Sequence, residues 1–114
     1  IDFEVLGELE KYGGKELITE TLEDFRQEAD QLIKSCGESF NFGDYDDILA
    51  KLHTLKGNAS TLGISRMARL AKETEADLKQ KKKSRLKEQL AELQEAFSEF
   101  EQAFTDFINT TKNG

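Results

Sequence analysis

The residue in this chain best suited to group-transfer chemistry is its single histidine. His53 is followed by Lys56 and Gly57, and on a helix the residues three and four positions later lie on the same face, one turn on. An imidazole is mostly neutral at pH 7 and offers a ring nitrogen as a nucleophile, while a lysine can neutralise an anion attached to that nitrogen. Glycine costs a helix about 0.5–1 kcal/mol relative to alanine, so we interpret Gly57 as space for a bulky group beside the ring. The three residues together suit a transferable phosphoryl group.

The helix that positions His53 is predicted from apolar spacing. Alternate steps of three and four residues, typical of one face of an α-helix, connect Tyr45, Ile48, Leu52, Leu55, Ala59 and Leu62. His53 follows Leu52 by one residue, a rotation of about 100° around the helix. We therefore expect the imidazole to lie at the edge of a buried seam, where a large partner can reach it.

The segment His53-x-x-Lys56-Gly57, followed by Leu62-Gly63, resembles the signature of histidine-containing phosphotransfer (HPt) domains. The resemblance implies that His53 carries a phosphoryl group between aspartates of response-regulator receiver domains. It places Lys56 near the phosphoryl oxygens and implies that Gly57 keeps the approach open. We expect attack through Nε2, and Ser60, a turn further along, is a candidate contact. No cofactor is expected in this chain, and Mg²⁺ is expected in the partner receiver domain.

Composition and charge narrow the class of protein. The 114 residues, 37% hydrophobic and 34% charged, include no proline, and we expect a single domain over residues 1–114 built from long helices. A net charge of −7 argues against nucleic acid as a partner. No run of 18 apolar residues exists, so we expect no membrane contact by this domain. A chain that begins at Ile1 is expected to be an excised domain or a processed protein, located in the cytoplasm either freely or within a membrane-bound sensor kinase.

The other helices are predicted from the same spacing. We expect a short helix over residues 2–11, burying Phe3, Leu6 and Leu9 and ending at Gly13-Gly14, and long helices over about 15–39, 45–61, 66–81 and 84–110. Residues 37–43 are predicted to form a loop, with Asp44 and Ser65 as N-caps and Gly63 as a helix stop. The predicted seams of the remaining long helices are Ile18, Leu22, Phe25, Ala29, Leu32 and Cys36; Met67, Leu70, Ala71, Thr74 and Leu78; and Leu86, Leu90, Leu93, Phe97, Phe100, Phe104 and Phe107.

Four long helices with matching stripes and short connections predict an all-α fold. We expect an antiparallel up-down-up-down four-helix bundle with the short N-terminal helix as a cap. Four apolar seams can satisfy one another in a monomer. Cys36, the only cysteine, continues a stripe and is interpreted as a small buried hydrophobe rather than a reactive thiol.

The sequence lacks the residues that other kinds of chemistry require. With one histidine and one cysteine, no metal site is indicated. The sequence contains no phosphate-cradling glycine loop, so ATP binding is not expected. The basic run from Lys79 to Arg85 is interpreted as a solvated helix end. Leu49 and Met67 are interpreted as core residues, with a docking patch near His53 as the alternative. Three hypotheses remain: a phosphorelay carrier, free or within a parent hybrid sensor histidine kinase; the phosphoacceptor module of a chemotaxis-type kinase; and a non-catalytic helical adaptor.

Overall fold

The part of the chain described by the computed structural model folds into four α-helices and contains no strand. Their bounds are α1 (Phe3–Phe42), α2 (Tyr45–Thr61), α3 (Ser65–Lys79) and α4 (Leu86–Asn113). The structure describes the backbone of residues 3–113 and the side chains of residues 7–8 and 10–109. The predicted burial of Phe3, Leu6 and Leu9 lies outside the described side chains.

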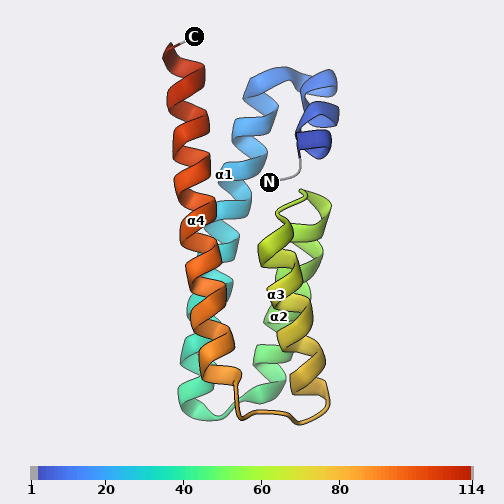
Figure 1. The fold of residues 1–114 in the computed structure, drawn as a ribbon, viewed down its shortest axis with the longest axis vertical. Coiled ribbons are helices and arrows are strands. Elements are labelled where there is room, and N and C mark those ends of the chain that lie inside the picture. Colours follow the sequence, from blue (N-terminus) through green and yellow to red (C-terminus); the bar gives the residue numbers. More distant parts are fainter. Residues whose placement is uncertain (1–2, 114) are drawn as a thin grey trace.

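Helix α1 is broken by a kink at Gly14. This residue has φ 69° and ψ −164°, a conformation that glycine adopts readily because it has no Cβ. The predicted break at Gly13-Gly14 is therefore confirmed. In Figure 1 the short segment before the kink turns back and lies beyond the connection between α2 and α3, at that end of the bundle.

The end of α1 differs from the prediction. Residues 37–42 continue the helix instead of forming a loop, so the predicted end at residue 39 is wrong. The helix continues because Cys36 is buried and Phe40 packs against the core, which outweighs the helix-breaking tendency of Gly37. The chain turns at Gly43, which has φ 73°.

Helix α2 has the predicted bounds. Asp44 is its N-cap, as predicted, and its side chain accepts a hydrogen bond of 3.1 Å from the backbone N–H of Asp47. At the other end Gly63 has φ 69°, so the predicted helix stop is confirmed. Ser65 is not an N-cap, because Ile64 takes that position and the Ser65 hydroxyl donates to the Gly63 carbonyl instead.

The connection between α3 and α4 is longer than predicted. Helix α3 ends at Lys79 rather than at residue 81, and α4 begins at Leu86 rather than at residue 84 and continues to Asn113 rather than ending at residue 110. Lys81 has φ 61°, a left-handed conformation that cannot continue a right-handed helix. The C-terminal turn of α3 is closed by the Lys82 N–H, which donates to the Asp77 carbonyl at 2.9 Å.

The helices form a ring in which each packs against two neighbours. Contacts join α1 with α2, α2 with α3, α3 with α4 and α4 with α1, and Figure 1 shows the elongated antiparallel arrangement. All the predicted seams supply buried residues, although Ile33 is more deeply buried than the predicted Leu32, and Leu90 and Phe107 are only partly buried. The all-α four-helix bundle is thus confirmed, with α2 and α3 side by side along one side of it.

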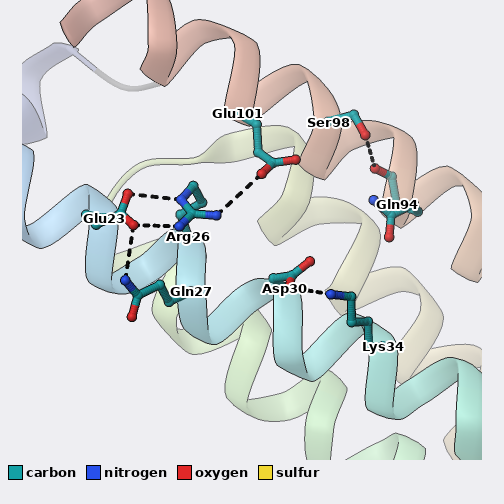
Figure 2. Close-up of polar contacts among 8 residues, drawn as sticks. All are labelled: Glu23, Arg26, Gln27, Asp30, Lys34, Gln94, Ser98 and Glu101. Carbon is teal, nitrogen blue, oxygen red and sulfur yellow. Dashed lines mark hydrogen bonds and ion pairs between the residues drawn. The ribbon is translucent and has the colours of Figure 1, made fainter.

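The opposite side, between α1 and α4, is closed by aromatic and charged contacts. The Phe25 ring meets the Phe100 ring edge-on at 5.1 Å between centroids. Figure 2 shows Arg26 between Glu23 on its own helix and Glu101 on α4, at 3.7 Å from the Glu101 carboxylate. The hydrogen bond from Arg26 holds the pKa of Glu23 at about 2. This side therefore supports the bundle, while the histidine lies on α2.

Candidate functional site

His53 lies beside the buried seam of α2, as its position after Leu52 predicts. Leu52 and Leu55 are fully buried, whereas 66% of the His53 side chain is exposed. The imidazole is accessible to solvent although its backbone belongs to a helix packed on two sides. This is the placement that a residue reacting with a large partner requires.

A buried carboxylate on the neighbouring helix holds the imidazole in place. The Nδ1 atom of His53 lies 2.9 Å from Oε2 of Glu75, which is on α3 and has only 6% of its side chain exposed. The other oxygen, Oε1, accepts a hydrogen bond of 2.7 Å from Nζ of Lys56, and Nζ of Lys79 lies 3.9 Å from the same oxygen. Glu75 thus joins two helices and three basic side chains.

The electrostatics of this cluster keep Glu75 ionised. Burial by itself would raise the pKa of the Glu75 carboxyl, but the hydrogen bonds from Lys56 and His53 and the charges of Lys56 and Lys79 outweigh it, and the pKa is lowered. An ionised carboxylate only accepts hydrogen bonds. The shared proton therefore lies on Nδ1 of His53, and a neutral ring then carries its free electron pair on Nε2.

The other predicted site residues share this face of α2 but differ in their contacts. The ammonium of Lys56 is bound to Glu75, and 28% of its side chain is exposed. Gly57 is exposed, and a Cβ built at this position would meet no atom within 4 Å. Ser60 is also exposed, and among the described residues its hydroxyl has no hydrogen-bond partner. The structure brings His53 and Lys56 together through Glu75 and leaves open space at Gly57.

Glu75 was not among the site residues predicted from the sequence. The apolar stripe of α3 could have indicated it. Glu75 lies four residues after the buried Ala71 and three residues before the buried Leu78. A charged residue at such a position needs a partner when the helix packs. Only the pairing of α2 with α3 in space identifies its partners on α2 as His53 and Lys56.

Two apolar residues and the basic run were also considered as possible contacts of a partner. Met67 is fully buried and belongs to the core, whereas Leu49, one turn before His53, is partly buried. All residues of the basic run, from Lys79 to Arg85, are exposed, and some of them still contact other side chains. Lys83, for example, has its Nζ 4.0 Å from the centre of the Tyr45 ring.

The described residues contain neither a grouped metal site nor a membrane-spanning helix. No three His, Cys, Asp or Glu side chains there are grouped so that they could hold a metal ion. Nor does any helix within residues 3–113 contain the long apolar stretch that a bilayer crossing requires.

Comparison with known proteins assigns the family. The model of the Hpt domain family matches residues 20–103, which include His53, Glu75 and most of all four helices, and the chain therefore belongs to the Hpt domain family. Membership implies histidine phosphotransfer in two-component signalling, and Hpt domains generally interact with response-regulator receiver domains. No curated protein and no solved structure matches the chain.

Proposed function

We propose that this chain is a phosphorelay carrier whose phosphorylated residue is His53. It accepts a phosphoryl group from an aspartate of one receiver domain and donates it to an aspartate of another. The observation that carries this proposal is the contact between Nδ1 of His53 and the buried carboxylate of Glu75. That contact fixes the proton on Nδ1 and leaves Nε2 as the nucleophile of an exposed ring.

The transfer step follows from this arrangement. The electron pair of Nε2 attacks the phosphorus of the aspartyl phosphate in line, an N–P bond forms, and the P–O bond to the aspartate breaks as its carboxylate leaves. The imidazole gains positive charge as the N–P bond forms. The Glu75 carboxylate, which accepts the Nδ1–H, stabilises that charge without taking the proton.

The remaining site residues have distinct roles in this proposal. Lys56 neutralises the phosphoryl oxygens, and Gly57 lets the active site of the receiver domain close over the ring. Ser60 is a candidate hydrogen-bond donor to the phosphoryl group or to the partner. The Mg²⁺ ion and the acidic pocket that bind the phosphoryl group in the receiver belong to that partner, and this chain needs no cofactor of its own.

The test uses a receiver domain carrying a radiolabelled phosphoryl group. Wild type is incubated with it beside His53→Gln, and far-ultraviolet circular dichroism checks that both are folded. Label on the wild type that is lost in acid and kept in base, with none on the variant, is the expected result. Equal labelling of the two proteins would show that His53 is not the carrier.

A second arm separates the donor classes. A chemotaxis-type kinase domain with ATP replaces the receiver domain as phosphoryl donor. Labelling from the receiver and not from the kinase domain is expected of a phosphorelay carrier. Labelling from the kinase domain alone would instead assign the chain as the phosphoacceptor module of such a kinase, and labelling from neither would favour an adaptor.

A further inference from the structure

Once His53 is phosphorylated, the ammonium of Lys56 lies near two anions, the Glu75 carboxylate and the phosphoryl group. Its ammonium is bound to Oε1 of Glu75 at 2.7 Å, and a phosphoryl group on Nε2 would add about 1.5–2 negative charges on the same face. If Lys56 turns to the phosphoryl oxygens, Glu75 loses its closest cation. A carboxylate with 6% of its side chain exposed is costly to leave without a counter-ion.

A second cation is already in place beside Glu75. Lys79 follows Glu75 by four residues on α3, one turn later, and its Nζ lies 3.9 Å from Oε1, the oxygen that Lys56 occupies. That distance is too long for a hydrogen bond, so Lys79 contributes its charge but leaves the oxygen to Lys56. Its side chain is 61% exposed, and a small movement would bring the ammonium into contact.

We propose that Lys79 is a positioning residue for phosphotransfer, which takes over Oε1 of Glu75 when Lys56 turns to the phosphoryl group. This inference rests on the proposed function of His53. Glu75 then has a bound ammonium both before and after transfer, and its other oxygen keeps the hydrogen bond from Nδ1 of His53. No covalent bond changes in this exchange, and the two lysines keep their protons.

The described surroundings of Glu75 single out Lys79 for this role. Glu75 forms ion pairs with His53, Lys56 and Lys79. Other lysines have other contacts, since Lys51 pairs with Asp47 at 3.7 Å and Lys83 lies over the Tyr45 ring. Lys72, by contrast, is exposed on the same helix and forms no ion pair among the described residues, which makes it a matched control.

The test is a double-mutant cycle on the full chain. Wild type, Lys56→Gln, Lys79→Gln and the double variant receive label from the phosphorylated receiver domain, and both the rate and the extent of labelling at equilibrium are measured. Lys79→Gln should lower the equilibrium constant for transfer, calculated from that extent, by about 3- to 10-fold, the equivalent of a charge pair of about 1 kcal/mol. Lys79→Arg should restore it, and Lys72→Gln should match wild type.

The decisive comparison is between the effect of Lys79→Gln in wild type and its effect in the Lys56→Gln variant. In Lys56→Gln no ammonium leaves Glu75, so adding Lys79→Gln should lower the extent far less than it does alone. An equal loss in both proteins would overturn the proposal, because Lys79 would then act independently of Lys56. Electrostatic attraction of the partner by Lys79 would give that result. A Lys79→Gln variant that labels like Lys72→Gln would overturn it as well. Failure of the proposed function has a different signature, because wild type would then carry no label or His53→Gln would carry as much as wild type.

Discussion

The Nδ1 atom of His53 and the Oε2 atom of Glu75 lie 2.9 Å apart across the interface between α2 and α3. The two side chains differ sharply in exposure, 66% for the imidazole and 6% for the carboxylate. An exposed ring is thereby oriented by a buried anchor, which is itself fixed by the packing of α3. The site combines access for a large partner with a defined orientation of the ring that we propose as the nucleophile.

The first prediction concerns that anchor. The amide of Glu75→Gln can donate to Nδ1 as well as accept from it, so the variant no longer fixes the proton on Nδ1 and carries no charge to stabilise the phosphorylated ring. We expect phosphotransfer from a receiver domain to fall by about 10- to 100-fold, as for loss of a charge-assisted hydrogen bond worth about 1.5–3 kcal/mol.

The matched control for this prediction lies on the same helix. Glu73 is exposed and pairs with Arg69 rather than with His53, so Glu73→Gln should transfer at the wild-type rate. The tautomer of His53 can be followed directly by nitrogen-15 NMR of the imidazole. A Glu75→Gln protein that transfers as fast as Glu73→Gln would contradict the role of the carboxylate.

The second prediction concerns stability in acid. The pKa of Glu75 in the folded protein is below its ordinary value of 4.5, through the hydrogen bonds and charges that outweigh its burial. The unfolded chain therefore binds the proton more readily, so the contribution of Glu75 is fully present above about pH 4.5 and is lost as the pH falls through the folded pKa.

Urea unfolding of wild type and Glu75→Gln at a series of pH values measures this contribution. The difference in the free energy of unfolding between the two proteins should be largest above about pH 5 and should shrink steadily in more acidic solution. Glu23 titrates in both proteins, so its own lowered pKa cancels in the difference. A difference that stays constant, or grows, as the pH falls from 5 would show that Glu75 is not stabilised as a carboxylate.

The third prediction separates stability from transfer at Gly57. A Cβ at this helical position meets nothing within 4 Å, so Gly57→Ala should stabilise the folded protein by about 0.5–1 kcal/mol. The same methyl group would occupy space beside His53 and obstruct a partner, and we expect transfer to slow by about tenfold or more. Thermal unfolding and receiver-dependent labelling measure the two effects.

Gly37 provides the comparison for this change. It also lies within a helix, and a Cβ there also meets nothing within 4 Å, but it is on α1. Gly37→Ala should therefore bring a similar gain in stability with no loss of transfer. If both variants transferred like wild type, the space at Gly57 would have no function in partner approach.

The fourth prediction concerns the thiol of Cys36. Burial, reinforced by the negative charge of Asp47, raises its pKa from 9.0 to about 11, which lowers the thiolate fraction near neutral pH by about 100-fold. We expect the native protein to react very slowly with a thiol reagent such as Ellman's reagent, and the urea-unfolded protein to react at once. Rapid stoichiometric reaction of the native protein would show that Cys36 is accessible and not a core residue.

The sequence predicts local features of this fold better than the contacts between helices. The bounds of α2 follow from its apolar stripe, the Asp44 cap and Gly63, all of which are local signals. The predicted loop at Gly37 is wrong because a single glycine does not end a helix whose neighbouring residues Cys36 and Phe40 still pack inward. Local spacing cannot show which residues of another helix come near, and Glu75 was missed for that reason.

The placement of the phosphoryl group on His53 tests the central claim most directly. The nitrogen-15-labelled protein, phosphorylated by a small-molecule donor such as phosphoramidate, can be examined by phosphorus and nitrogen NMR. Coupling of the phosphorus to Nε2 of His53, with Nδ1 still protonated and hydrogen-bonded, is the predicted result. Coupling to Nδ1, or a phosphoryl group on any other residue, would contradict the assignment of Nε2 as the nucleophile and of Glu75 as the group that fixes it.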